Sequence, residues 1–307
     1  MKTKLHLLAM IPALIFSAGC DFNLFGGKEK QMEKVNVVIL SGQSNAVGCK
    51  AYSFLESTMP DKYNEYLAGY EGVQIAFNNY TVDYMSSSRP KYIQNSSPKS
   101  KFTKVQLGQG NSTSNFGPEV GMAEELHQRW GSKLYIIKIA CGASCLGLDW
   151  SLAEDEMFVN LVKFVNNRMA ELEENGLKPY LRAFCWMQGE GDSYDGYYQF
   201  YKENLINLKK NLDKELLKYT EDNNLPFIDA GIGPGTHSNG ENEWHYYKEV
   251  NEAKKEFAAL SETNIYFDTI EAGLHSDREP NDDVHYDSES QIKLGHLFAQ
   301  NFEKFLK

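Results

Sequence analysis

Five short runs of apolar, β-branched and aromatic residues alternate with longer stretches of helical periodicity, and this alternation constrains the fold most strongly. The apolar runs are residues 35–40 (VNVVIL), 134–140 (LYIIKIA), 181–186 (LRAFCW), 226–232 (PFIDAGI) and 265–268 (IYFD). Runs of this length and composition predict buried strands. Strands that alternate with helices pair in parallel through crossover connections. The sequence therefore predicts an α/β fold, a three-layer α/β/α sandwich with a mainly parallel five-stranded sheet.

Apolar residues at helical spacing predict the helices that should cover this sheet. These helices are expected over residues 118–130, 158–172, 205–216, 251–260 and 292–305. Gly176 is placed to end the second of them. Residues 51–116 are different, because they are rich in Tyr, Asn and Ser and contain few long apolar runs. We expect them to form a loop-rich insertion over the active face rather than a second domain.

The N-terminus has the pattern of an export signal. Lys2 and Lys4 precede an apolar stretch that is too short to span a bilayer, and the stretch ends in FSAGC, which resembles a bacterial lipobox. Residues 1–19 are therefore expected to be a lipoprotein signal peptide, Cys20 the lipidated first residue, and residues 20–34 a tether to a domain at 35–307. We expect an exported, membrane-anchored lipoprotein, in the periplasm or on the cell surface. An ordinary secretory signal with a chance cysteine is the alternative.

Charge and cysteine content exclude some functions. The formal net charge of −11 argues against a nucleic-acid partner, which would need a basic face. Beyond the signal, Cys49, Cys141, Cys145 and Cys185 allow three complete disulfide pairings, and the sequence does not choose among them. No C-x-x-C or histidine-rich spacing of a metal site is present, so no zinc site is expected. The serine chemistry considered below requires no metal and no organic cofactor.

A serine follows the first predicted strand directly, in the sequence GQSN (42–45). At this place the hydroxyl of Ser44 would lie at the carboxyl edge of the sheet, and its N–H at the positive end of the next helix. The same residue could instead be a helix cap. The G-x-S-x-G elbow of the α/β-hydrolases is not matched, because Ala46 stands where the second glycine is needed.

Two further strand ends carry residues that suit an oxyanion hole. Gly142 lies in a Gly-rich turn after the run at 134–140, where a backbone N–H can approach a ligand closely, although a plain turn would look the same. In WMQGEGD (186–192), the amide of Gln188 could donate to an oxyanion. Glu190 could be a turn residue or bind a sugar hydroxyl.

The sequence DDVH (282–285) contains a candidate base and its orienting acid. One turn of chain can aim the carboxylate of Asp282 at Nδ1 of His285 while Nε2 faces a serine. Asp283 is a competitor for the role of the acid, and His275 is the main rival for the base.

These pieces, in this order, resemble the sequence blocks of the SGNH (GDSL-type) hydrolase superfamily. More narrowly they are similar to the sialate O-acetylesterases, the carbohydrate acetylesterases with G-Q-S-N and W-x-Q-G-E. The resemblance covers about residues 35–305. It implies the same sandwich fold, with Ser44 as nucleophile, His285 as base and Asp282 as orienting acid.

The resemblance also implies which groups surround this triad. The oxyanion donors are the backbone N–H groups of Ser44 and Gly142 and the side-chain amide of Gln188. Supporting or substrate-binding roles fall to Gln43, Asn45 and Glu190. Two positions depart from the family pattern. Ala46 replaces a large apolar residue, and Cys141 replaces the first glycine of a Gly-Gly pair, which puts the shape of the pocket in doubt and leaves room for a disulfide near it.

The activity implied is removal of O-acetyl groups from carbohydrate, either sialic acid or a plant or host glycan, through an acetyl-serine intermediate. The expected partners are an O-acetylated carbohydrate and, through the lipid anchor, a membrane. Two alternatives stay open: a lipid-anchored carbohydrate-binding protein without catalysis, and a short-chain lipase or thioesterase of the same superfamily. Tyr-rich segments and the aromatic residues at 244–247 suit sugar rings, but such residues also suit an ordinary surface.

Overall fold

A central strand, β1 (Glu33–Gly42), organises the fold, since every residue from Val35 to Gly42 is buried. The computed structural model describes residues 32–85, 89–95, 99–194, 196–237, 239–280 and 282–307. The other strands are β2 (Lys50–Ala51), β3 (Tyr70–Phe77), β4 (Tyr80–Asp83), β5 (Lys91–Gln94), β6 (Lys99–Val105), β7 (Asn115–Phe116), β8 (Leu134–Gly142), β9 (Leu177–Met187), β10 (Phe227–Ala230) and β11 (Asn264–Phe267).

The main sheet has the order β11-β10-β9-β1-β8-β3-β6, with β4 and β5 attached beside β8. The five predicted strands occupy consecutive places from β11 to β8, and all of their pairings are parallel. Gly42 at the end of β1 pairs with Ala140 of β8 and with Met187 of β9. The carboxyl ends of three neighbouring strands therefore meet at one edge, which is where an α/β sheet places its site.

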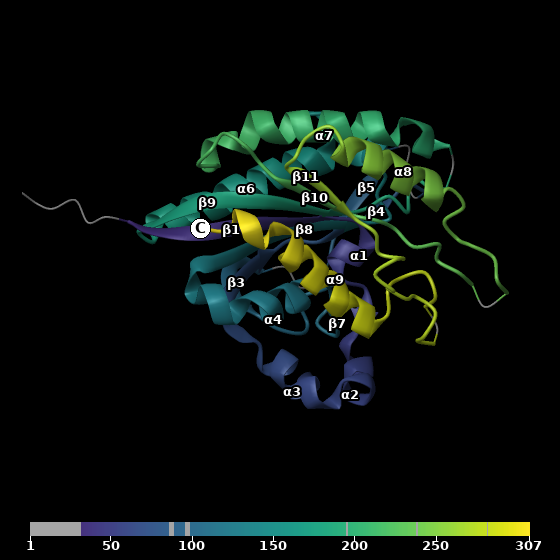
Figure 1. The fold of residues 1–307 in the computed structure, drawn as a ribbon, viewed down its shortest axis with the longest axis horizontal. Coiled ribbons are helices and arrows are strands. Elements are labelled where there is room, and N and C mark those ends of the chain that lie inside the picture. The colour runs from purple at the N-terminus through teal and green to yellow at the C-terminus, as the bar shows by residue number, and fades with distance from the viewer. Residues whose placement is uncertain (1–31, 86–88, 96–98, 195, 238, 281) are drawn as a thin grey trace, which may run out of the picture. The chain divides into compact units, whose positions relative to one another are not determined.

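Helices cover both faces of this sheet, which confirms the predicted three-layer sandwich (Figure 1). In that view α6, α7 and α8 lie on one side of the sheet, and α4 and α9 on the other. The helices are α1 (Ser44–Val47), α2 (Leu55–Thr58), α3 (Pro60–Ala68), α4 (Glu119–Trp130), α5 (Leu146–Asp149), α6 (Glu156–Glu174), α7 (Tyr201–Leu216), α8 (Tyr247–Ala258) and α9 (Ser288–Phe302). All five predicted helices are present, and Gly176 follows the end of α6 with a φ of 77°.

The segment 51–116, expected to be rich in loops, instead contains α2, α3 and strands β3 to β6. The main sheet consequently has nine strands in the described residues rather than the predicted five. Strand β3 pairs in parallel with β8 and antiparallel with β6. These strands escape prediction because their residues are mixed: β6 reads KSKFTKV and is largely exposed, so it lacks the apolar run that marks a buried strand.

Residues 32–307 form one compact unit. The expectations for the signal peptide 1–19, for lipidation at Cys20 and for most of the tether lie outside the described residues. The last two residues of the expected tether, Glu33 and Lys34, belong to β1. Among the described helices, none combines the length and apolar character needed to cross a bilayer.

Candidate active site

A sharp turn after β1 presents Ser44. Gly42 has a φ of 140°, and a Cβ there would lie 1.9 Å from the carbonyl oxygen of Met187, so only glycine fits. Gln43 N then donates to the same oxygen at 2.9 Å. Ser44 begins α1 and Gln43 is its N-cap, so Ser44 is not the capping residue. Since α1 has only four residues, its dipole is small, and what the turn supplies at Ser44 is an N–H without an intrahelical acceptor.

The loop before α9 holds the predicted acid and base in contact. Nδ1 of His285 lies 2.9 Å and 3.1 Å from the two carboxylate oxygens of Asp282. The backbone N–H of His285 also donates to Asp282 Oδ1 at 3.1 Å. Burial raises the pKa of Asp282, but the hydrogen bonds and charge of His285, with a contribution from Lys50, outweigh it and hold the pKa below its usual range. The ionised carboxylate can therefore orient the ring and stabilise its protonated form.

Asn45 joins the serine turn to this loop. Its Oδ1 accepts hydrogen bonds from Tyr286 N and from Gln291 Nε2, each at 3.1 Å. Its Nδ2 donates to Glu190 Oε1 at 2.8 Å. Three segments that are distant in sequence therefore meet on one amide. In the described residues, no hydrogen bond joins the Ser44 hydroxyl to the His285 ring itself.

Gln43 lies between the serine turn and the loop after β9. Its Oε1 accepts from Gln188 Nε2 and from Gly191 N, each at 3.1 Å. The serine turn is thereby tied to the loop that follows β9. Because this contact is buried, it resists competition from water.

Gln188 does not fit its expected role as an oxyanion donor. The side chain is fully buried, and its amide nitrogen has three acceptors within the protein: Gln43 Oε1, Ser144 O and Asp192 Oδ2. An amide nitrogen carries two hydrogens, so none is left for a substrate. Tyr201 donates to Gln188 Oε1 at 2.9 Å, which fixes the orientation of the amide. Gln188 is a buried brace in this structure.

The carboxylates after Gln188 are also internal. Glu190 is 1% exposed, and burial raises its pKa. Since its Oε1 is held by Asn45, the structure favours a supporting role over contact with a sugar hydroxyl. Asp192 accepts from Leu146 N at 2.7 Å and from Gly147 N at 3.3 Å, and so fixes the start of α5.

The turn after β8 differs in detail from the expectation. Gly142 ends β8, and a Cβ there would come no closer than 3.5 Å to another atom, so space alone does not require glycine. Instead Ala143 has a φ of 62°, a conformation that favours glycine. Cys141 points into the core, and among the described residues no disulfide links the four cysteines. Within the part of the chain that the structure describes, the disulfide considered near the pocket is therefore not formed.

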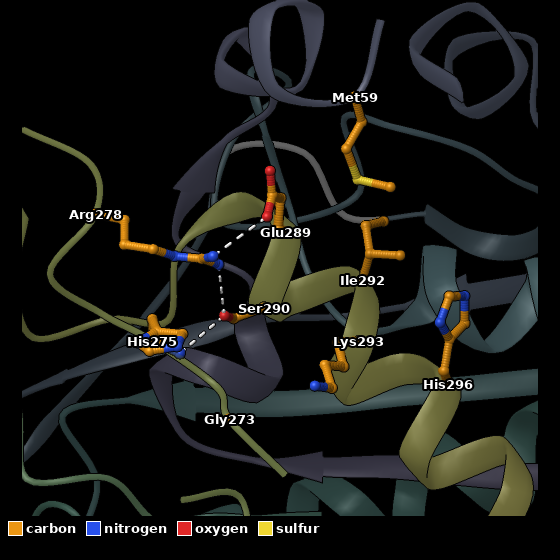
Figure 2. Close-up of a pocket in the computed structure, with 9 residues that line it drawn as sticks. All are labelled: Met59, Gly273, His275, Arg278, Glu289, Ser290, Ile292, Lys293 and His296. Carbon is orange, nitrogen blue, oxygen red and sulfur yellow. Dashed lines mark hydrogen bonds and ion pairs between the residues drawn. The ribbon is translucent and has the colours of Figure 1, made fainter. Parts of the chain in front are cut away.

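The two rival residues have other partners. Asp283 lies 3.2 Å from Nδ1 of His237, whose Nε2 lies 2.7 Å from Glu243. Glu243 and then Asp283 raise the pKa of His237. His275 lies in a cavity of about 420 Å³ along α9, beside Arg278 and Ser290 (Figure 2). A second cavity borders Asp282 and is described below. The two cavities share no lining residue. Neither rival therefore forms the acid–base pair.

Sequence reasoning missed two residues at the site. Gln291, on α9, helps to hold Asn45, and Lys50 is buried with its Nζ 3.4 Å from Asp282 Oδ2. Neither carries a signal in the sequence, because burial of a lysine depends on segments that only folding brings together.

A cavity of about 730 Å³ opens beside Asp282, and its lining includes Asp277, Glu279, Asp282 and Asp283.

The fold is that of the SGNH-like hydrolases, a mainly parallel sheet between two helical layers. The chain belongs to the carbohydrate esterase family of sialic acid-specific acetylesterases (SASA), whose model matches residues 34–304. This membership confirms the predicted family and supports a carboxylic ester hydrolase. A comparison with curated proteins gave no match.

Solved structures with a similar fold include three with TM-scores above 0.5. A protein from Arabidopsis thaliana is 20% identical, with a TM-score of 0.59 over 89% of this chain and 99% of that chain. NanS is 13% identical, with a TM-score of 0.57 over 90% and 98%. A carbohydrate acetylesterase from Xanthomonas citri is 16% identical, with a TM-score of 0.51 over 89% and 56%. At these identities they establish a similar fold and no more.

Proposed function

We propose that the protein is a serine esterase that removes O-acetyl groups from carbohydrate. The observation that carries the proposal is the Asp282–His285 pair, held by Asn45 against the turn that presents Ser44. Such an arrangement suits a hydroxyl nucleophile, because the acid fixes the tautomer in which Nε2 of the imidazole accepts a proton. The proposed steps use only groups of the chain and water.

In the first half of the reaction, Ser44 Oγ attacks the acetyl carbonyl carbon while His285 Nε2 accepts the hydroxyl proton. The hydrogen bond between serine and histidine forms as substrate binds, since catalytic hydrogen bonds commonly tighten only in the complex. The sugar oxygen then leaves with the proton from His285. In the second half, water attacks the acetyl-serine by the same steps and releases acetate.

The negative charge of the tetrahedral intermediate falls to backbone donors. We assign them as the N–H groups of Ser44 and Gly142, at the carboxyl ends of two adjacent strands, β1 and β8. Loss of one such donor would remove about 3–4 kcal/mol of transition-state stabilisation. Gln188 supports the site through its hydrogen bond to Gln43 and does not donate to the substrate.

The charge near the site favours a neutral sugar over sialic acid. The cavity next to Asp282 is lined by three further acidic residues, of which Asp283 pairs with His237 and Glu279 lies 3.7 Å from Lys50, and the whole chain has a net charge of −11. A substrate with its own carboxylate would be repelled there. We therefore propose acetylated neutral glycans as the preferred substrates.

Acetate release decides the proposal. The purified domain and its Ser44→Ala and His285→Ala variants are incubated with an aryl acetate, an aryl octanoate, an acetylated neutral oligosaccharide and O-acetylated sialic acid. The wild-type protein is expected to release acetate from the acetylated substrates. Both variants are expected to have lost this activity. A binding protein would release nothing, and a lipase would prefer the octanoate; either result would exclude the proposed activity.

We also propose that the protein is exported and anchored by a lipid on Cys20, in the periplasm or on the cell surface. The support is the charged, apolar and lipobox-like order of residues 1–20. Mass analysis of the mature N-terminus and membrane fractionation of a Cys20→Ala variant test this. A soluble wild-type protein would instead indicate an ordinary secretory signal.

A further inference from the structure

Lys50 is a buried cation in contact with the acid of the proposed site. It lies in the short strand β2 and is 2% exposed. Its Nζ donates to the carbonyl oxygen of Asp282 at 3.1 Å and lies 3.4 Å from the carboxylate oxygen Oδ2 of the same residue. One ammonium group therefore contacts Asp282 at both its backbone and its side chain.

A second carboxylate faces the same ammonium group. Glu279 is 8% exposed, and its Oε2 lies 3.7 Å from Lys50 Nζ. The other oxygen of Glu279 accepts from Ser288 N at 2.8 Å and from the Ser288 hydroxyl, at the start of α9. A buried lysine is tolerated only when anions compensate its desolvation, and here two carboxylates do so. Two roles are thus possible for Lys50: neutralising Glu279, or holding Asp282.

The contacts of Asp282 favour the second role. Its Oδ2 is shared between Lys50 Nζ and His285 Nδ1, which lies 2.9 Å away. Its Oδ1 is engaged by the backbone N–H groups of Val284 and His285. Because the lysine also holds the carbonyl oxygen, the carboxylate cannot turn away from the imidazole without breaking a contact to a buried charge.

We propose that Lys50 is a positioning residue of the proposed esterase site, which holds the carboxylate of Asp282 against His285 Nδ1 and balances its charge. This inference rests on the proposed function. It adds a residue from β2, outside the sequence blocks that carry the resemblance, to the acid–base pair.

The sign of the electrostatic effect follows from the charges around His285. Asp282 comes from its own loop, Glu190 from the loop after β9 and Lys50 from β2, with Glu279 and Asp283 beyond them. The thiol of Cys49 is neutral there, since burial raises its pKa to about 12. Lys50 offsets part of the negative charge that stabilises imidazolium. Without the lysine, the negative charge beside the acid–base pair would be less compensated, so the acid limb of the pH profile of kcat/KM should move to higher pH.

Four variants separate positioning from simple neutralisation: Lys50→Met, Lys50→Arg, Glu279→Gln and the double variant Lys50→Met/Glu279→Gln. Lys50→Met alone leaves the buried Glu279 and the half-buried Asp282 without their cation and is expected to lower stability. The double variant removes the charge of Glu279 while keeping the acceptor for Ser288, so it should recover stability. The readouts are the thermal midpoint and the pH profile of kcat/KM with an aryl acetate.

The double variant is expected to fold but to lose about tenfold in kcat/KM at pH 7, because a poorly oriented base loses part of its catalytic contribution. The acid limb of its profile should move up by about half a pH unit to one unit. Glu279→Gln should stay within about twofold of wild type, and Lys50→Arg should keep the wild-type acid limb, because both keep a cation beside Asp282.

A double variant with wild-type kcat/KM and an unmoved acid limb would overturn the positioning role while leaving the esterase proposal intact. Lack of turnover by the wild-type protein would instead overturn the proposed function and this inference with it.

Discussion

Asn45 Oδ1 accepts a hydrogen bond from Tyr286 N at 3.1 Å, and these two residues are 241 positions apart. The contact joins the residue after the proposed nucleophile to the residue after the proposed base. Because the same amide donates to Glu190, its orientation is fixed from both ends. The geometry of the site therefore depends on one buried side chain.

Asn45→Asp should disrupt this junction, since it places a second carboxylate against the buried Glu190. We expect a loss of about 3 kcal/mol in the free energy of unfolding and a fall of about 100-fold in kcat/KM as the base is displaced. Adding Glu190→Gln supplies a donor to the new carboxylate and should restore most of the stability. Urea unfolding of both variants measures this, and equal damage in the two would contradict the assigned contact.

Gln188→Ala should lower stability and activity together. The change removes one side-chain hydrogen-bond partner from each of the buried residues Asp192 and Tyr201, which should cost about 2–4 kcal/mol of unfolding free energy. An oxyanion donor would behave differently, because its loss lowers kcat by about 100- to 1,000-fold in a protein of unchanged stability. Unfolding and steady-state kinetics of the same preparation distinguish the two roles.

Ala143→Gly should stabilise the protein by about 0.5–1 kcal/mol. For a residue with a Cβ, the left-handed conformation that Ala143 adopts costs roughly 1–2 kcal/mol. Glycine avoids this cost, and its greater entropy in the unfolded chain offsets only part of the gain. Ala253→Gly, within α8, is the matched control and should destabilise by about 1 kcal/mol. Destabilisation of similar size at both positions would refute the conformation assigned to the turn.

Asp192 should make stability depend on pH between about 4 and 6. Burial raises the pKa of Asp192 to about 6, so its proton is held more tightly in the folded than in the unfolded chain. The protonated carboxyl of Asp192 therefore adds to the free energy of unfolding below pH ~4. This contribution, about 3 kcal/mol, is lost as the pH rises through 6. Wild type should therefore lose stability relative to Asp192→Asn over this range, as measured by urea unfolding at several pH values. A constant difference between the two would rule out the buried, protonated carboxyl.

Hydrophobic periodicity was sufficient to locate the five central strands and the five long helices. It was not sufficient for β6, whose polar residues reflect an exposed end of the sheet, or for β3, whose apolar residues are interrupted by Glu71, Gly72 and Gln74. The motifs GQSN, WMQGE and DDVH led to the correct family and to the residues that the fold brings to one edge. The rule that parallel strands end at the same edge grouped Ser44, Gly142 and Gln188, whereas DDVH follows no strand directly and was grouped with them through the family resemblance.

The sequence alone determined the class of fold, the family and the choice of candidate residues, because periodicity and short motifs are local properties of the chain. Only the tertiary structure decided that Asp282 and not Asp283 faces His285, that the amide of Gln188 is already occupied, and that Lys50 lies against the acid. Such pairings depend on distances near 3 Å between segments that are far apart in sequence, and no local pattern specifies them.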